Sequence, residues 1–109
     1  MNLIGVKKYP KMLSLNYWIE TVKVEFLQSF EYDLKKIPDK SLKNKIKEII
    51  ILLQGSDKIS VINKVKKIKG TSNAYRIRIG DYRLGFFYND NIIELSRFVH
   101  RKDIYKLFP

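Results

Sequence analysis

Three arginines stand close together in the stretch AYRIRIGDYRLGFF, residues 74–87. The pair Gly80-Asp81 separates two alternating runs and predicts a β-hairpin, because glycine tolerates the positive φ that a type II′ turn needs at its first central position. One face of this hairpin would carry Arg76, Arg78 and Arg83. The other face would carry the apolar set Tyr75, Ile77, Ile79, Tyr82, Leu84 and Phe86. The pattern therefore separates a surface that faces the core from a surface suited to binding an anion.

The predicted register places Arg78 directly opposite Arg83. Like charges opposed in this way destabilise a sheet by up to about 1 kcal/mol, and nothing in the core requires them. This cost favours a bound anion. Gly85, opposite Arg76, would let the backbone of a ligand approach closely. The alternative is that the arginines form the ordinary solvated face of an antiparallel sheet.

More residues that could take part in chemistry come at the end of the chain, in HRKDIYKLFP. If Asn89-Asp90 forms the preceding loop, His100 shares the face of the arginines, while Arg97 falls on the apolar side. Arg101 comes next, and Tyr105 returns over the same region if the segment is helical. Neighbouring arginines favour the neutral imidazole, which suits His100 to accept a proton. Capping or packing is the alternative for His100, and core packing for Tyr105.

The charge of the chain indicates the class of partner. Its 109 residues carry 22 lysines and arginines against 11 aspartates and glutamates, a net charge of +11. This surplus attracts polyanions, so nucleic acid or an acidic protein is the expected partner. Cysteine is absent and there is one histidine, so ligands for a metal are lacking and we expect no cofactor. No run approaches the roughly 18 apolar residues of a membrane span, and the first residues do not look like a secretion signal, so we expect a cytoplasmic protein.

The hydrophobic pattern predicts a single domain over residues 18–109, after an N-terminal extension over residues 1–17. Alternation predicts a strand at 18–26, and helical spacing predicts a short helix that Ser29 caps and Pro38 ends. The later elements are a helix from Asp39 to Gly55, a linker at 56–62, the basic segment NKVKKIKG anchored by Val65 and Ile68, the hairpin, a turn at 89–91, a strand at 92–100 and a helical turn after Asp103. The expected fold class is α+β: two N-terminal helices on one face of a small, mainly antiparallel four-stranded sheet in the order β-α-α-β-β-β, plus a short C-terminal helix.

At KIKG, AYRIRIGDYRLGFFY and HRKDIYKLFP the chain resembles the RelE/ParE superfamily of bacterial toxins, and within it the RelE-type mRNA interferases. The resemblance covers residues 18–109. It implies the toxin of a type II toxin–antitoxin system, a metal-independent endoribonuclease that cleaves messenger RNA in the ribosomal A site and so inhibits translation. The implied partners are messenger RNA, the ribosome and a cognate acidic antitoxin that covers the basic face. Operator DNA would be bound only indirectly, through the antitoxin complex.

The resemblance also implies roles for single residues. Arg76 and Arg78 stand where members of the family use basic residues, often lysine. Arg83 matches a phosphate-contacting arginine, Arg101 the arginine after the last strand, and Tyr105 the terminal tyrosine, which would stack on a base or orient the nucleotide.

Arginine keeps its proton at any ordinary pH, so the arginines cannot replace a lysine that acts as base. His100 is the preferred general base and Glu94 the second choice. Lys67 and Lys69 would hold flanking phosphates or ribosomal RNA.

Two other functions stay open. A ParE-like toxin shares the fold and inhibits DNA gyrase through protein contacts, although HRKDIY argues against it. A non-catalytic module would use the basic face to bind nucleic acid, or an acidic partner, without turnover.

Overall fold

The computed structural model describes residues 22–54 and 65–109. Their elements are, in chain order, β1 (Lys23–Phe26), α2 (Gln28–Lys35), α3 (Lys40–Gln54), β2 (Val65–Lys67), β3 (Ala74–Ile79), β4 (Tyr82–Asn89), β5 (Ile92–His100) and α4 (Ile104–Leu107). The five strands form one sheet in the order β1-β5-β4-β3-β2, in which β1 runs parallel to β5 and the other pairs are antiparallel.

The α+β class and the order of the predicted elements are confirmed, but the sheet has five strands and not four. The additional strand is β2, whose residues lie in the predicted basic segment NKVKKIKG. A strand of three residues is too short to show a clear alternation, and its pairing with β3 is what defines it. The predicted extension over residues 1–17, the start of the first strand, the helix stop at Gly55 and the linker at 56–62 lie outside the described residues.

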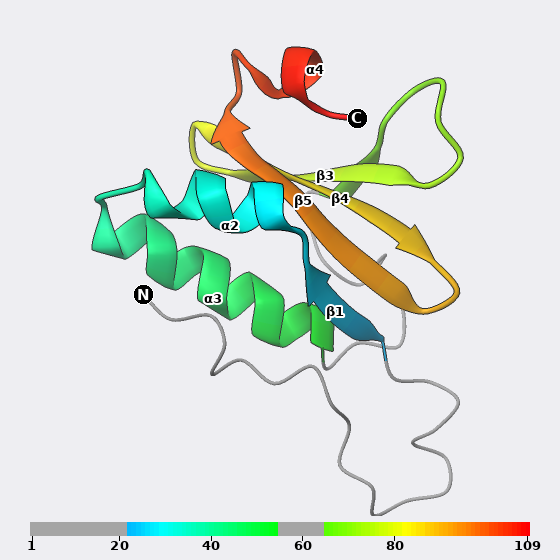
Figure 1. The fold of residues 1–109 in the computed structure, drawn as a ribbon, viewed down its shortest axis with the longest axis horizontal. Helices are drawn as coiled ribbons and strands as arrows, with labels where there is room; N and C mark the ends of the chain where they lie inside the picture. The colour runs from blue at the N-terminus through cyan, green and yellow to red at the C-terminus, as the bar shows by residue number, and fades with distance from the viewer. Residues whose placement is uncertain (1–21, 55–64) are drawn as a thin grey trace, which may run out of the picture.

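The two long helices pack on one face of the sheet (Figure 1). Helix α3 begins directly after Asp39, where its start was predicted, and Asp39 caps it: Asp39 Oδ1 accepts hydrogen bonds from the backbone N–H groups of Ser41 (2.8 Å) and Leu42 (3.2 Å). The predicted cap of α2 is wrong. Ser29 lies inside α2, the N-cap residue is Leu27, and the Ser29 hydroxyl is engaged elsewhere.

The main core lies between these helices and the sheet. It joins Phe30 and Leu34 of α2, Ile46, Ile50 and Leu53 of α3, and the inward-facing residues of the strands, among them Val24, Ile77, Leu84, Phe86, Leu95 and Phe98. The apolar side of the predicted hairpin belongs to this core, so the expected separation of the two faces is confirmed.

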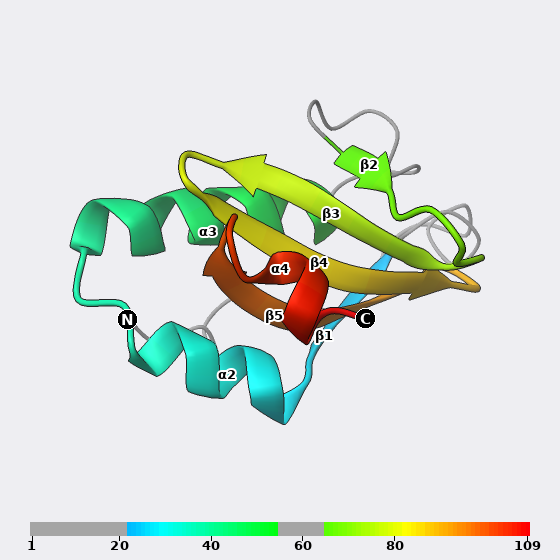
Figure 2. The ribbon, with the colours of Figure 1, turned by 90° about the horizontal axis from the view of Figure 1, so that it is seen from above.

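A second, smaller apolar cluster lies on the opposite face, under α4 (Figure 2). Ile104 and Phe108 pack there against Ile68, Ala74, Phe87 and Val99. This cluster holds the C-terminal segment against the face of the sheet that carries the arginines.

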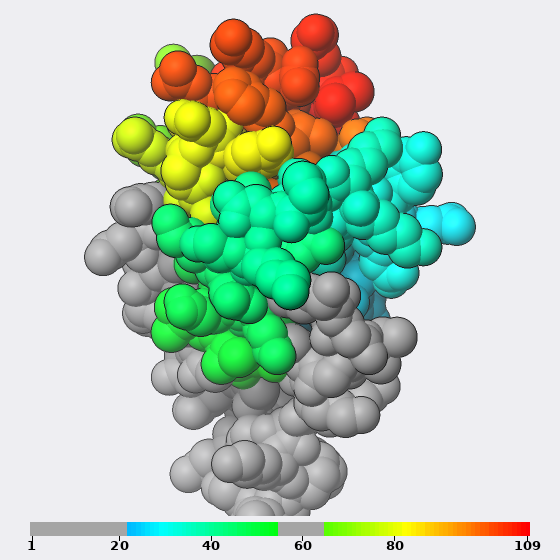
Figure 3. Space-filling model, turned by 90° about the vertical axis from the view of Figure 1, so that its left-hand side faces the viewer, coloured from blue at the N-terminus to red at the C-terminus, as the bar shows by residue number. Residues whose placement is uncertain are grey.

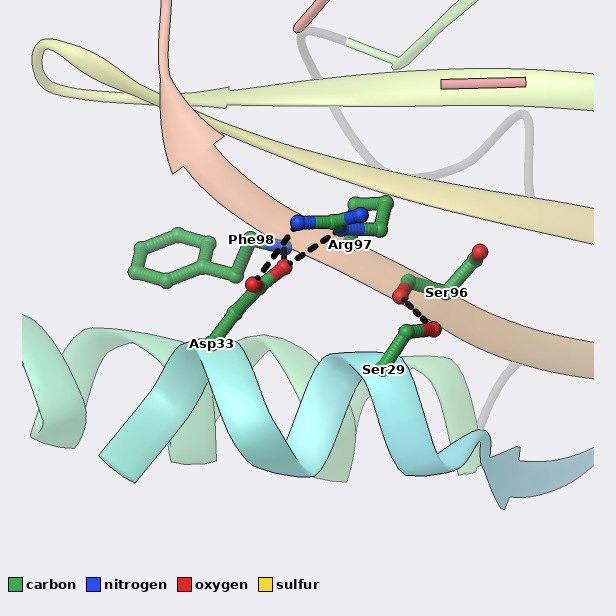
Figure 4. A network of polar contacts seen from close by, with 5 residues as sticks. All are labelled: Ser29, Asp33, Ser96, Arg97 and Phe98. Carbon is green, nitrogen blue, oxygen red and sulfur yellow. Dashed lines mark hydrogen bonds and ion pairs between the residues drawn. The ribbon is translucent and has the colours of Figure 1, made fainter. Parts of the chain in front are cut away.

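Helix α2 also covers an open edge of the sheet (Figure 4). Strand β1 pairs only with residues 92–95 of β5, so among residues 22–54 and 65–109 the rest of β5 has no neighbouring strand on that side. Ser29 Oγ donates a hydrogen bond to the carbonyl oxygen of Ser96 (2.7 Å), and Phe98 N–H donates to Asp33 Oδ2 (2.9 Å). Side chains of α2 thus satisfy backbone groups that another strand would otherwise bind.

Candidate functional site

The β3–β4 hairpin has the register that the sequence predicts. Arg78 lies opposite Arg83 and Arg76 lies opposite Gly85, and Gly80 has the positive φ (58°) that the turn needs. Directly paired residues of an antiparallel sheet project to the same side, so the three arginines share the face on which α4 packs.

Arg83 lies at the centre of a group of cations. Partial burial lowers the pKa of Arg83, and the neighbouring guanidinium groups of Arg76, Arg78 and Arg101 lower it further, while Tyr105 acts in the opposite direction. These residues come from β3, β4, the segment after β5 and α4. We call Arg76, Arg78, Arg83 and Arg101 the arginine cluster.

The turn of the hairpin is tied to the segment that follows β5. The backbone N–H of Arg101 donates to the carbonyl oxygen of Asp81 (2.8 Å), and Arg83 Nη1 donates to the carbonyl oxygens of Gly80 (3.0 Å) and Tyr82 (2.9 Å). Figure 3 shows this end of the molecule, where the yellow atoms of the turn lie beside the orange atoms of the segment after β5. Both side-chain contacts use Nη1 of Arg83. They fix the guanidinium group without using Nε or Nη2.

Tyr105 lies beside the cluster with its ring in solvent. Its exposed fraction is 67%, and the Arg76 guanidinium carbon is 5.8 Å from the centre of the ring. The buried residues Ile104 and Phe108 flank it in sequence and anchor α4 to the sheet. An aromatic ring that is both exposed and anchored is suited to stacking on a planar ligand.

The expectation that Gly85 leaves room for a ligand is wrong. A Cβ atom at this position would lie 2.6 Å from Phe108 Cδ2, so the Phe108 ring occupies the space above the glycine. Gly85 is therefore where the C-terminal segment docks onto β4. No signal in the hairpin itself indicates this, because Phe108 is 23 residues further along the chain.

We predict that Gly85→Ala destabilises the protein by about 1–3 kcal/mol, because the added methyl group overpacks against a buried ring. The free energy of unfolding, measured by urea denaturation, tests this. In a Phe108→Ala background the same change should cost much less, since the ring is gone. An equal cost in both backgrounds would contradict the assignment of Phe108 as the residue that fills the space.

The predicted face of His100 is wrong. His100 lies opposite Tyr82, whose ring contacts it at a centroid distance of 5.7 Å, so it belongs to the side of the sheet that carries α2 and α3. The pairing of β4 with β5 shifts between Gly85 and Phe86, which leaves Ser96 as an extra residue in β5. One extra residue reverses the side on which every later residue of the strand projects. His100 Nδ1 also accepts a hydrogen bond from the backbone N–H of Lys102 (3.1 Å).

The same shift corrects the position of Arg97. It lies opposite Gly85, on the face of the arginines and not on the apolar side. There it forms an ion pair with the buried Asp33 of α2, with Nε 2.7 Å from Oδ2 and Nη2 2.9 Å from Oδ1 (Figure 4). Asp33 is not among the predicted site residues, because in the sequence it looks like one more polar residue of a surface helix.

Glu94, the second candidate base, is paired with Phe87, far from the hairpin turn. Val99, the partner of Arg83, lies five positions further along β5, which corresponds to roughly 16–17 Å at about 3.3 Å per residue. The structure does not bring Glu94 to the arginine cluster.

Of the two lysines predicted to bind RNA, Lys67 lies opposite Tyr75 and so belongs to the side of the main core. Lys69 follows β2 in an exposed turn. The lysine that shares the face of the arginines is Lys66, which lies opposite Arg76. Alternation with the anchor Val65 could have indicated this, had the segment been read as a strand.

No arginine of the cluster forms an ion pair with a carboxylate within the described ranges. The two ion pairs found there join Arg97 to Asp33 and Lys106 to Asp103. Residues 22–54 and 65–109 also contain no group of three carboxylate or imidazole side chains placed to hold a metal ion. No helix in this described part is long and apolar enough to span a membrane.

Comparisons with known proteins identify the family. Residues 24–105 match the family described as the ParE toxin of the type II toxin-antitoxin system, parDE. Over 89 residues, 81% of this chain and 100% of the relative, the sequence is 43% identical to "Toxin RelE3" of Methanocaldococcus jannaschii.

Two solved structures have the same fold. The crystal structure of the RelB-RelE antitoxin-toxin complex from Methanococcus jannaschii matches with a TM-score of 0.68 and 41% identity, over 78% of this chain and 99% of that one. The archaeal RelE-RelB complex from Pyrococcus horikoshii OT3 matches with a TM-score of 0.61 and 25% identity, over 77% of this chain and 99% of that one.

The family match, the curated relative and the shared fold define a toxin of a type II toxin–antitoxin system. The chain belongs to the RelE/ParE superfamily of type II toxin–antitoxin systems, as a RelE-type toxin.

Proposed function

We propose that this toxin is a metal-independent endoribonuclease that cleaves messenger RNA in the ribosomal A site and so inhibits translation. The observation that carries the proposal is the convergence of four guanidinium groups beside the exposed ring of Tyr105. Their mutual repulsion is a cost of folding that a bound polyanion would offset. The net charge of +11 agrees with a polyanionic substrate.

The arginine cluster supplies the charge that such a reaction needs. The 2′-hydroxyl of the RNA attacks the adjacent phosphorus, the bond to the 5′-oxygen breaks, and a cyclic phosphate is left. Negative charge builds up on the phosphorane oxygens in the transition state. Guanidinium groups fixed before the reaction stabilise this charge without reorganisation, a contribution worth several kcal/mol in enzymes. Arg83 fits this role best, because its contacts with the turn fix it.

Tyr105 has a different role in the proposal. Its exposed ring stacks on a base of the single-stranded message and so aligns the 2′-hydroxyl with the phosphorus. Arg76, which lies over the same ring, then contacts the phosphate next to the stacked base.

The role of His100 as general base stays a prediction, and its contacts in the structure argue against it. The ring packs on Tyr82, and Nδ1 already accepts a hydrogen bond from the backbone N–H of Lys102. We expect His100→Gln to lower the cleavage rate less than about tenfold, below the usual effect of losing a general base. A loss of 100-fold or more, together with loss of the acidic limb of the pH–rate profile, would restore His100 as the base.

The partner in the proposal is a cognate acidic antitoxin. The solved complexes that this chain resembles join a RelE toxin to a RelB antitoxin. An acidic segment laid over the arginine cluster would neutralise it and exclude RNA, and operator DNA would be reached only through that complex. Such a toxin acts in the cytoplasm, where ribosomes translate.

The competing function is ParE-like inhibition of DNA gyrase. We consider it because the matched family is described as the ParE toxin. Mapping the 5′ ends of messages on translating ribosomes tests the nuclease directly. We expect new ends at A-site codons and, on the fragment before each cut, a cyclic phosphate. A gyrase supercoiling assay with the same protein provides the contrast: inhibition of gyrase without new message ends would overturn the proposal.

A further inference from the structure

Strand β2 adds a lysine to the face that carries the arginine cluster. Lys66 pairs with Arg76, so the two side chains project to the same side. Ile68, two residues on, has the same parity and packs with Ile104 and Phe108 of α4. Both observations place Lys66 on the side of the C-terminal helix, and Figure 2 shows β2 at the edge of the sheet beside β3.

The reaction proposed above needs a proton that the arginine cluster cannot give. When the bond between phosphorus and the 5′-oxygen breaks, the oxygen leaves as a poor alkoxide unless a proton reaches it. Arginine does not release its proton at ordinary pH. His100 faces the other side of the sheet, and Glu94 pairs with Phe87 at the far end of the strands.

Lys66 meets this need. The ammonium group of lysine can donate a proton, and a long flexible side chain carries it. Lys66 is exposed, so the group can reach a bound RNA. Its partner Arg76 lies over the Tyr105 ring, which puts Lys66 next to the site where the base would stack.

We propose that Lys66 is a catalytic residue that donates a proton to the leaving 5′-oxygen, an inference that rests on the proposed nuclease function. A bond forms between the 2′-oxygen and phosphorus as the bond between phosphorus and the 5′-oxygen breaks. The 2′-hydroxyl proton passes to solvent. The Lys66 ammonium protonates the 5′-oxygen and then regains a proton from water.

The test compares two messages on programmed ribosomes, one normal and one with sulfur in place of the 5′-oxygen at the scissile bond. A thiolate leaves without protonation, so the second message does not need the donor. We expect Lys66→Ala to lower the rate on the normal message about 10²-fold or more. On the message with sulfur, the cleavage rate of Lys66→Ala should be within a few-fold of the wild-type rate.

Lys67→Ala is the matched control, because it removes the same charge from the same strand on the opposite side. Lys67→Ala should change the cleavage rate by the same factor on both messages, whatever the size of that factor. An equal loss on both messages with Lys66→Ala would show a charge contact only and would overturn the inference. No loss on the normal message would overturn it as well. Absence of cleavage by the wild-type protein would instead overturn the nuclease function on which the inference rests.

Discussion

Arg83→Ala should lower the rate of ribosome-dependent message cleavage by about 10²–10³-fold, the usual effect of losing one fixed donor to a developing oxyanion. Arg83 lies at the centre of the arginine cluster, and two backbone carbonyl oxygens hold its guanidinium group. Arg101→Ala should have an effect of the same kind, since Arg101 reaches the cluster through its backbone contact with Asp81. Single-turnover cleavage on programmed ribosomes measures both effects.

Two further variants test whether the geometry and position of the Arg83 guanidinium group matter beyond its positive charge. Arg83→Lys keeps the charge but loses the forked geometry, so it should recover only part of the rate. Lys47→Ala removes one positive charge from the exposed face of α3, on the other side of the sheet, and should cleave like wild type. Wild-type rates for both Arg83→Ala and Arg101→Ala would remove the arginine cluster from the proposed site.

Asp33→Ala should destabilise the fold by about 3–5 kcal/mol, the range typical of breaking a buried ion pair from one side. The Asp33 side chain is 4% exposed and accepts three hydrogen bonds, two from Arg97 and one from Phe98 N–H. Its removal leaves a cation and a buried backbone donor without partners. Urea denaturation measures the loss.

Glu31→Ala provides the comparison, because Glu31 is an exposed carboxylate on the same helix and should change stability by less than about 0.5 kcal/mol. A double-mutant cycle with Arg97→Ala then isolates the interaction of the pair. If Asp33→Ala cost less than about 1 kcal/mol, α2 would not hold the edge of β5 in the way that the contacts indicate.

Local patterns in the sequence were enough to predict the elements that depend on local contacts. The hairpin at Gly80-Asp81 has the predicted register because a two-residue turn fixes which residues face each other. The turn predicted within residues 89–91 is also local, but its two loop residues are Asp90 and Asn91, both with positive φ, and not Asn89-Asp90. Asp39 caps α3 through bonds to residues two and three positions away.

Contacts between distant residues decided the rest of the site. Ser96 is an extra residue in β5 only because of its pairing with β4, and this shift sends His100 away from the arginines and brings Arg97 toward Asp33. Phe108 fills the space above Gly85 although nothing near the glycine indicates it.

The sequence by itself therefore determined the α+β class, the hairpin and the face shared by Arg76, Arg78 and Arg83, since these follow from alternation and turn chemistry. Only the tertiary structure decided that Arg101 and Tyr105 join that face, that Lys66 and not Lys67 does so, and that His100 does not. The physical reason is that register between strands, once a residue is inserted, depends on which distant backbone groups pair.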